Sequence, residues 1–229
     1  MSPNQLSQPL ISVIIPVYNQ PKELALSLAS LKNQTYKNLE IIIQEDKLHE
    51  GAPKMRNSGL AKAKGEYVIF WDADVVAVPE MLEKLQKALV ENPGVSFAYC
   101  DYYFLTLNFG WVKAYKQIIA GEFNEEKLRK NNYIHSTSLI RKDVAIKWDE
   151  SLKRFQDWDL WLTLAEHDKN GVYVPGFLFK IIAKGTMSSW LPRLAYKKPW
   201  KYLPGFSGRV KNYEVARAVI AQKHSLNLF

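Results

Sequence analysis

Tyr67-Val-Ile-Phe-Trp-Asp72-Ala-Asp74-Val-Val-Ala-Val-Pro79 is the stretch that decides the fold of this chain. The residues from Tyr67 to Trp71 favour a β-strand, and two carboxylates spaced i, i+2 follow at once. In an α/β sheet the ligand crevice lies beyond the carboxyl ends of the strands. Two aspartates there can hold a hard divalent cation, which prefers oxygen ligands and often binds substrate phosphates as well. The alternative is that Asp72 and Asp74 form a solvated turn, so the rest of the sequence has to decide.

Two earlier apolar runs, residues 10–15 and 39–43, are typical of strands buried on both faces. Helical patterns over residues 21–31 and 52–63 separate these strands from each other and from the strand at 66–71. A succession of strand, helix, strand, helix and strand predicts βαβ units. We therefore expect an α/β fold with a doubly wound, mostly parallel sheet flanked by helices.

The ends of the two helices carry typical boundary residues. Asn19 is predicted to cap the first helix, and Pro21 suits its first turn. Gly65 is predicted to follow the end of the second helix as its C′ residue.

Polar residues follow each of the three strands. They are Tyr18 and Asn19, Glu45 and Asp46, and Asp72 and Asp74. Because parallel strands end at one edge of the sheet, these side chains are expected to face one crevice, as in a nucleotide site. The chain has neither Gly-x-Gly-x-x-Gly nor Gly-x-x-x-x-Gly-Lys, which excludes a dinucleotide fingerprint and a P-loop. A diphosphate at this edge would therefore need a metal to neutralise it.

Five blocks of sequence resemble family 2 glycosyltransferases of the GT-A fold in order and spacing. The blocks are Ser12-Val-Ile-Ile-Pro-Val-Tyr-Asn19, Glu40-Ile-Ile-Ile-Gln-Glu-Asp46, Arg56-Asn57-Ser-Gly-Leu60, Gly65-Glu-Tyr67 and Trp71-Asp-Ala-Asp74. Five blocks in register are far more specific than any one of them. The resemblance implies a nucleotide-diphosphate-sugar donor and a Mn²⁺ or Mg²⁺ ion.

The resemblance also implies roles for individual residues. Tyr18 and the backbone from Pro16 to Tyr18 would flank the base, Asp46 would accept a hydrogen bond from it, and Arg56 would help to hold the nucleotide. Asp72 would bind the ribose or the metal, and Asp74 would ligate the metal directly. Taken singly, each residue also has an ordinary structural explanation, and it is the combination that favours a site.

Two departures from the family pattern concern this site. Glu45 stands where the family usually has a second Asp followed by Gly-Ser, whereas this chain continues Asp46-Lys-Leu-His49. Many members also place a metal-binding His after the base helix, and the corresponding stretch Lys180–Ser188 contains none. The grip on the nucleoside and the metal ligand set are therefore expected to differ from the family's usual ones.

The middle of the chain, which faces the acceptor in glycosyltransferases, does not identify an acceptor. A helix with an apolar stripe is predicted over residues 82–89, a strand over 95–99 and a hairpin over 104–117. Asn124 is predicted to cap a short helix over residues 125–130. Cys100 is expected to be a buried small hydrophobe.

A second block, Phe155-Gln-Asp157-Trp-Asp159, opens a helix and resembles the family's Glu-Asp-x-Asp block. The resemblance implies that Asp157 is the general base, with Gln156 in place of the usual Glu. An inverting transfer needs such a group, because the acceptor hydroxyl loses its proton as it attacks the anomeric carbon. The alternative is that Asp157 only caps the helix. Asp159 is expected to support structure, and His135 to approach the acceptor.

The net charge of +8 lies entirely in the last part of the chain. Residues 184–229 hold nine Lys or Arg and one acid, whereas residues 1–183 hold 22 of each sign. We predict a glycosyltransferase domain over 1–183 and a basic, aromatic-rich extension over 184–229, including an amphipathic helix with Val215, Val219 and His224 on one side. The extension suits an anionic membrane surface or packing on the domain equally, and nucleic acid less, since no nucleic-acid fold precedes it.

The sequence shows no signal peptide and no run long enough to span a membrane, and its single cysteine suits a reducing compartment. We expect a cytoplasmic enzyme, on the inner membrane face if the extension binds lipid. The predicted function is a metal-dependent, inverting glycosyltransferase of polysaccharide biosynthesis that acts on a glycan or a lipid-linked glycan. The alternatives are a degenerate transferase that binds a nucleotide sugar or a partner and, less favoured, a nucleotidyltransferase.

Overall fold

The computed structural model describes residues 8–108, 111–183 and 207–227. Strands and helices alternate through the first half of the chain. The strands are β1 (Ile11–Val17), β2 (Leu39–Glu45), β3 (Tyr67–Phe70), β4 (Val75–Ala77), β5 (Phe97–Asn108), β6 (Trp111–Ile118), β7 (Leu139–Arg141) and β8 (Gly171–Ala183). The helices are α1 (Pro21–Lys32), α2 (Ala52–Lys62), α3 (Met81–Glu91), α4 (Glu125–Lys130), α5 (Gln156–Glu166) and α6 (Ser207–Lys223), with a 3₁₀ turn at Lys142–Val144.

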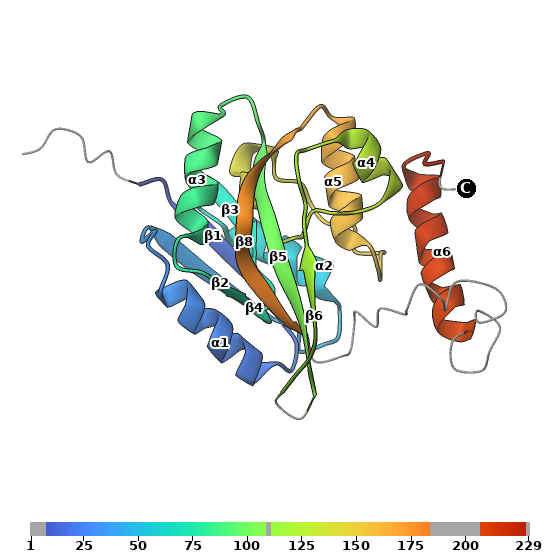
Figure 1. The fold of residues 1–229 in the computed structure, drawn as a ribbon, viewed down its shortest axis with the longest axis horizontal. Helices are drawn as coiled ribbons and strands as arrows, with labels where there is room; N and C mark the ends of the chain where they lie inside the picture. The colour runs from blue at the N-terminus through green and yellow to red at the C-terminus, as the bar shows by residue number, and fades with distance from the viewer. Residues whose placement is uncertain (1–7, 109–110, 184–206, 228–229) are drawn as a thin grey trace, which may run out of the picture.

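The strands form one sheet in the order β2-β1-β3-β7-β5-β8-β4, and β6 pairs with β5 (Figure 1). The first three strands are parallel, as the βαβ pattern predicts. Beyond β3 the sheet is mixed: β7 is antiparallel to β3 and to β5, β4 is antiparallel to β8, and β5 and β8 run parallel. The helix-flanked α/β sheet is therefore confirmed, but the sheet is mixed rather than mostly parallel. The strand-end residues follow the three strands that pair in parallel, β1, β2 and β3.

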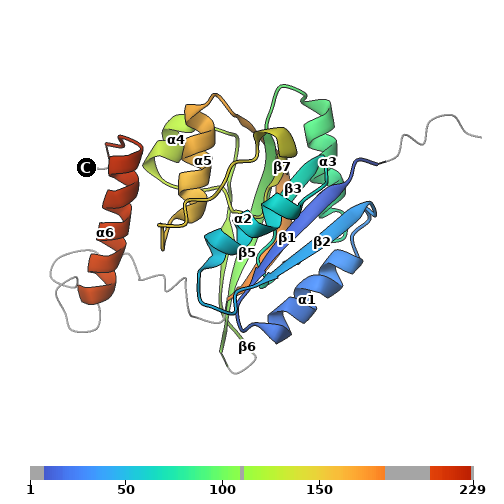
Figure 2. The same ribbon diagram turned by 180° about the vertical axis from the view of Figure 1, so that it is seen from behind.

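Helices cover both faces of the sheet, with α1 and α3 on one side and α2, α4 and α5 on the other (Figures 1 and 2). The strand period of two divides the apolar residues between two cores. In β3, Tyr67 and Ile69 belong to the core under α1 and α3, whereas Val68 and Phe70 belong to the core under α5. A continuous apolar run such as β3 is thus explained by burial on both faces.

The helix boundaries correct two of the sequence predictions. α1 begins at Pro21, and Gln20 rather than Asn19 is its N-cap, because Asn19 lies in the left-handed region at φ 48°. Gly65 is not a left-handed C′ residue; α2 ends at Lys62, and a Cβ on Gly65 would come within 2.5 Å of the Leu10 carbonyl oxygen. Gly65 is required by this close approach to β1.

The middle region follows the predictions in kind. β5 and β6 form an antiparallel hairpin, and β5 is longer than the strand predicted at 95–99. Asn124 caps α4, accepting a hydrogen bond from the Lys127 amide with its side chain. Cys100 is buried within β5.

Helix α6 lies outside α4 and α5 (Figures 1 and 2). The predicted apolar side of this helix is wrong: Val215 and Val219 are 55% and 45% exposed, whereas His224, just past the helix, is buried. Ile220 and Leu226 join the core beneath α5. Within the described ranges, no helix is long and apolar enough to cross a bilayer.

Candidate active site

The strand-end residues converge at the carboxyl edge of β1, β2 and β3. Val17 lies opposite Glu45 in the parallel register, and the Asp46 amide donates to the Val17 carbonyl oxygen at 2.8 Å. The segment after β1 and the segment after β2 are therefore fixed side by side. Asp72 and Asp74 follow the neighbouring β3. The alternation of strand and helix thus brings the three polar segments to one edge, as predicted.

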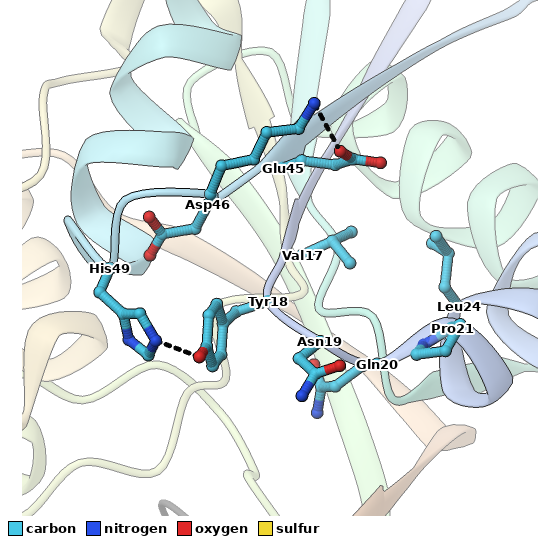
Figure 3. Close-up of a pocket in the computed structure, with 10 residues that line it drawn as sticks. Val17, Tyr18, Asn19, Gln20, Pro21, Leu24, Glu45, Asp46 and His49 are labelled. Atoms are coloured by element: carbon cyan, nitrogen blue, oxygen red, sulfur yellow. Dashed lines mark hydrogen bonds and ion pairs between the residues drawn. The ribbon is translucent and has the colours of Figure 1, made fainter.

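A pocket of about 370 Å³ lies between the first two of these segments (Figure 3). Its lining comes from the end of β1, the start of α1 and the loop after β2. The lining residues are Val17, Tyr18, Asn19, Gln20, Pro21, Leu24, Glu45, Asp46, Lys47 and His49. Pro16, Arg56 and Asp72 are not among them. A concave site with an aromatic wall and a few polar groups is typical of a small-molecule pocket.

Tyr18 and His49 form one wall of this pocket. The Tyr18 hydroxyl and His49 Nε2 are hydrogen-bonded, as Figure 3 shows. The centroids of the two rings are 3.9 Å apart. The sequence analysis predicted no role in the pocket for His49. Its place beside Tyr18 was not foreseen, because loop 46–51 departs from the family pattern at this point.

Asp46 organises the loop after β2. It is 7% exposed, and its two carboxylate oxygens accept from the Glu50 and Gly51 amides at 2.8 Å each. Each oxygen keeps a second lone pair, so these bonds leave room for a base donor. That Asp46 accepts a hydrogen bond from the nucleobase stays a prediction.

Asp72 is bound by three side chains. Its carboxylate accepts from Arg56 Nη2 at 2.7 Å and from the Ser136 hydroxyl at 3.2 Å, and His135 Nε2 lies 3.8 Å away. Burial raises the pKa of Asp72, but the charge and hydrogen bond of Arg56 outweigh it, so this pKa lies below the ordinary value. Asp72 is therefore an ionised carboxylate held in place.

Asp74 has the opposite electrostatic setting. Burial raises its pKa to about 7, and the charge of Asp72 adds to the shift. Two residues of the same type, two positions apart, thus differ because Arg56 pairs with only one of them. A carboxylate in this state is one that a bound cation would stabilise.

Arg56 connects Asp72 to helix α5. The side chain is 8% exposed, donates to Gln156 Oε1 at 3.2 Å as well as to Asp72, and lies over the Trp148 ring with 4.3 Å to its centroid. Gln156, which replaces the family's usual Glu, is therefore a neutral partner of this arginine. The predicted contact of Arg56 with the nucleotide stays a prediction.

Asp157 projects from the first turn of α5. Phe155 is the N-cap of this helix, so the alternative that Asp157 caps it is wrong. One Asp157 oxygen accepts from the Trp158 amide and the other from Asn132 Nδ2, both at 2.9 Å. Burial raises the pKa of Asp157, although His135 and Arg56 act against this rise. Asn132 was not foreseen, because nothing in its sequence context marks it.

His135 lies near both Asp72 and Asp157. Its Nδ1 accepts from the Thr137 amide at 3.0 Å, and its ring contacts Tyr102 and Phe179 at centroid distances of 5.1 and 5.3 Å. Burial lowers the pKa of His135, although the charges of Asp72 and Asp157 act against this. His135, whose role was least defined by the sequence, thus interacts electrostatically with both Asp72 and Asp157.

Comparison with known proteins identifies the family. The model described as "Glycosyl transferase family 2" matches residues 12–47 and 45–148, which is more than half of the chain. The chain belongs to glycosyl transferase family 2. It is therefore a glycosyltransferase, and the matched residues include Tyr18, Asp46, Arg56, Asp72 and Asp74.

Named relatives agree with this family. An uncharacterized glycosyltransferase of Methanocaldococcus jannaschii is 26% identical over 86% of this chain and 79% of that protein. The Escherichia coli UDP-Glc:alpha-D-GlcNAc-diphosphoundecaprenol beta-1,3-glucosyltransferase WfgD is 23% identical over 86% of both. Against an uncharacterized glycosyltransferase of Haemophilus influenzae, 27% identical, the chain covers 62% of the relative's length.

Solved structures show the same fold. S. aureus TarS 1–349 in complex with UDP-GlcNAc matches 80% of this chain and 61% of that one, with a TM-score of 0.63 and 19% identity. The GT-A-like fold predicted from the sequence is confirmed by this likeness, which at such identity speaks for the fold alone.

A metal site in this glycosyltransferase would need side chains that can serve as ligands. Among the residues that the structure describes, no group of three or more His, Cys, Asp or Glu side chains could hold a metal ion. Mg²⁺, however, is commonly bound by one or two carboxylates together with substrate phosphates and water. Asp74, a half-buried carboxylate whose pKa is raised to about 7, fits that donor set.

The basic extension is described only from residue 207 onwards. Residues 184–206, which include most of the stretch without histidine, lie outside the described part of the glycosyltransferase. The end of α6 packs on α5, where Lys223 and His224 contact Asp159. Packing on the domain therefore accounts for this end of the extension, while the boundary at 183/184 stays a prediction.

Proposed function

We propose that this glycosyltransferase is a metal-dependent, inverting enzyme that moves a sugar from a nucleoside-diphosphate donor to a hydroxyl group of a glycan or lipid-linked glycan. The observation that carries the proposal is the opposite setting of neighbouring carboxylates. Asp72 is neutralised by Arg56, while Asp74 and Asp157 have raised pKa values. Strongly shifted pKa values cluster at functional sites.

Asp157 supports the acid–base part of this proposal. Its two hydrogen bonds come from neutral donors, so each oxygen keeps a lone pair and the charge is not consumed by a cation. A raised pKa makes a carboxylate a better base, and a hydroxyl becomes more acidic as its oxygen bonds to the anomeric carbon. Asp157 would accept that proton, while the hydrogen bond from Asn132 orients the carboxylate.

The pocket of Tyr18, Asp46 and His49 supports the donor part. Its aromatic wall suits a nucleobase, and the free lone pairs of Asp46 suit a base donor. A UDP-GlcNAc complex exists for the structural neighbour TarS, and the name of WfgD gives UDP-Glc as its donor. We extend the class of donor, a nucleoside-diphosphate sugar, to this chain.

Asp74 would hold the divalent cation, Mn²⁺ or Mg²⁺, with Asp72 as a further ligand or as the ribose contact. When bound, the cation would neutralise the charge of the departing diphosphate. Arg56 fixes Asp72 from inside the fold and so keeps the carboxylate pair in one geometry. Without this cation, the carboxylates of Asp72 and Asp74 at the end of the strand would repel a diphosphate.

The proposals for the acceptor and for the cellular place of action are based on the name of one relative and on the charge of the extension. WfgD is named for a diphosphoundecaprenol-linked acceptor. A lipid-linked acceptor would explain why the extension 184–229 carries nine basic residues and one acid, since anionic lipid attracts such segments. We propose action on the cytoplasmic side, at the inner face of the membrane.

A degenerate transferase that only binds a nucleotide sugar is the second candidate. It is favoured by the absence of a three-ligand metal group among the described residues and by Glu45 and Gln156. Retention of Asp46, Asp72, Asp74 and Asp157 favours an enzyme. The two candidates differ in turnover and agree in binding.

The test is donor hydrolysis and transfer over a panel of nucleotide sugars with Mn²⁺ or Mg²⁺, for wild type and for Asp74→Asn. The matched control is Asp143→Asn, an exposed aspartate in the 3₁₀ turn. We expect one donor to react, only with metal, in wild type and the control, and a large loss in Asp74→Asn. Donor binding by calorimetry without turnover, acceptors included, would favour the binding module. No binding of any nucleoside diphosphate would overturn both.

A further inference from the structure

His135 has a ring nitrogen whose hydrogen-bonding role the fold leaves open. The Thr137 amide donates to Nδ1 at 3.0 Å, so Nδ1 acts as the acceptor. In a neutral imidazole one nitrogen accepts and the other carries the proton. The proton of His135 is therefore on Nε2, which becomes a hydrogen-bond donor.

The direction of this donor is fixed by packing. The His135 ring contacts Tyr102 and Phe179, and these two rings stack on each other with 5.0 Å between centroids and 4° between planes. The His135 carbonyl oxygen accepts from the Ser138 hydroxyl at 2.7 Å, which holds the backbone as well. The side chain is 14% exposed and its orientation is set from both ends.

No acceptor in the described part of the chain satisfies the Nε2 proton. Oδ2 of Asp72 lies 3.8 Å from Nε2, which is beyond hydrogen-bond distance. The Asp72 carboxylate is held in this position by Arg56 and Ser136. Nε2–H of this half-buried side chain is therefore available to a ligand or water that can accept its proton.

The surroundings of Nε2 select the kind of acceptor. Asp72 and Asp157 both act on His135 through their negative charges. Asp157, whose hydrogen bonds come from neutral donors, would repel a phosphate oxygen at this position. A hydroxyl group is neutral; it can accept from Nε2–H and at the same time donate its own proton to a carboxylate. A sugar hydroxyl therefore fits this position better than the diphosphate does.

We propose that His135 binds the transferred sugar of the nucleotide donor, with Nε2–H donating to one of its hydroxyl oxygens beside Asp72. The nearer carboxylate decides between donor and acceptor, because Asp72 lies on the strand edge that carries the nucleotide pocket. This inference deepens the proposed function and rests on it. His135 then distinguishes a nucleotide sugar from its free nucleoside diphosphate.

Two substitutions separate the proton donor from the ring. His135→Phe keeps an aromatic ring against Tyr102 and Phe179 and removes Nε2–H. His135→Gln keeps a donor and removes the ring. The matched control is His167→Phe, an exposed histidine at the end of α5 whose Nδ1 lies 2.8 Å from the Thr163 carbonyl oxygen. Thermal unfolding reports whether each variant is folded.

Calorimetry is then carried out with the donor found active for wild type and, separately, with its nucleoside diphosphate. We expect His135→Phe to bind the nucleotide sugar about 10- to 100-fold more weakly, because a hydrogen bond at a site built for it is lost. Binding of the nucleoside diphosphate should stay within about twofold of wild type. His135→Gln should recover part of the loss, and the control should match wild type.

A deoxy analogue of the donor sharpens the result. If the hydroxyl bound by His135 is the one removed, wild type and His135→Phe should bind the analogue equally. Equal weakening of sugar and diphosphate in a folded His135→Phe would overturn the proposal and indicate that the ring acts only by positioning Asp72. Unchanged binding of both by His135→Phe would also overturn it. If wild type itself binds no nucleotide sugar, the proposed function fails, and that failure is visible without any variant.

Discussion

The two faces of helix α5 hold aspartates in opposite surroundings. Asp157 faces the strand edge, where its bonds come from an amide and an asparagine and burial raises its pKa. Asp159, two residues on, is 4% exposed and contacts Lys223 Nζ and His224 Nε2 at 2.8 Å each. Lys223 and His224 balance the negative charge of Asp159 within the fold. The charges of Asp157 and Asp74 would instead be balanced by a bound ligand.

This difference separates function from stability in one helix. Lys223 also contacts Asp149 at 2.6 Å, and His224 Nδ1 lies 3.0 Å from Glu166. The Arg129 side chain donates to the His224 carbonyl oxygen at 3.0 Å. The end of α6 is therefore tied to α4, α5 and the loop before α5 at several points. A substitution on one face of α5 should change catalysis, and one on the other face should change folding.

The largest effect is expected for Asp157→Asn. The amide keeps the shape of the side chain but cannot accept a proton, and general-base catalysis contributes about 10²- to 10⁴-fold. We expect kcat for transfer to fall by about that factor, with the free energy of unfolding unchanged or slightly higher, since no cation loses its partner. Steady-state kinetics and urea unfolding measure the two quantities. Asp143→Asn is the control, and transfer at the wild-type rate by Asp157→Asn would remove its role.

The converse effect is expected for Asp159→Asn. Lys223 keeps Asp149 and His224 keeps Glu166, so only part of the network is lost. Breaking a buried pair costs about 3–5 kcal/mol, and the 38% exposure of Lys223 reduces this figure, so we expect a loss of about 2 kcal/mol. Urea unfolding measures it. The kcat of the folded variant should stay within a few-fold of wild type; a collapse of kcat without loss of stability would place Asp159 in the site.

A smaller effect concerns metal binding and pH. The folded pKa of Asp74, about 7, is above its ordinary value, so the carboxylate is protonated at pH 5.5 and ionised at pH 8. Without metal, this group makes the folded state less stable as pH rises from about 4 to 7. Because a metal ligand must be deprotonated, the increase in melting temperature on adding Mn²⁺ should be larger at pH 8 than at pH 5.5.

Asp74→Asn is the comparison for this measurement. It should abolish the pH dependence of the metal effect, while Asp143→Asn retains it. An equal rise in melting temperature for wild type and Asp74→Asn at pH 8 would show that Mn²⁺ binds elsewhere.

The sequence predicted the half of the fold whose signals are local. Strands buried on both faces, and a carboxylate pair at a strand end, can be recognised within a few residues, and they placed Asp46, Asp72 and Asp74 correctly on one edge. The mixed order beyond β3 was not predicted, because antiparallel pairing of β7 and β4 depends on partners far along the chain. Gly65 shows the same limit: its cause is the approach of Leu10, 55 positions away in the sequence.

The site was predictable to the same extent. Asp157 followed from a motif, but its partner Asn132 and the ring of His135 became visible only in three dimensions. The apolar side assigned to α6 was wrong because the helix packs through Ile220 and a charged end rather than through Val215 and Val219. Because α6 buries only Val210 and Ile220 among its helical residues, it carries no apolar stripe from which its buried face can be predicted.

The smallest effect that tests the comparison is the pH dependence of the α5–α6 contact. Burial lowers the pKa of His224, but the hydrogen bonds to Asp159 and Glu166 outweigh it and raise the pKa above its ordinary value. Stability from this group is therefore fully present below pH 6.5 and is lost as pH rises through the folded pKa. Hydrogen bonds from Lys223 and Ser151 lower the pKa of Asp149 to about 2, so its contribution is lost only as pH falls from about 4 to 2.

Between pH 6 and 9 the free energy of unfolding of wild type should therefore fall through the deprotonation of His224. His224→Gln cannot be protonated and should be less stable than wild type at pH 6, with a gap that narrows toward pH 9. Urea unfolding at matched ionic strength measures the gap, and His167→Gln, at an exposed histidine that follows α5, is the control. A gap that stays constant from pH 6 to 9 would show that His224 acts by shape alone, and the contrast between the two faces of α5 would then rest on Lys223.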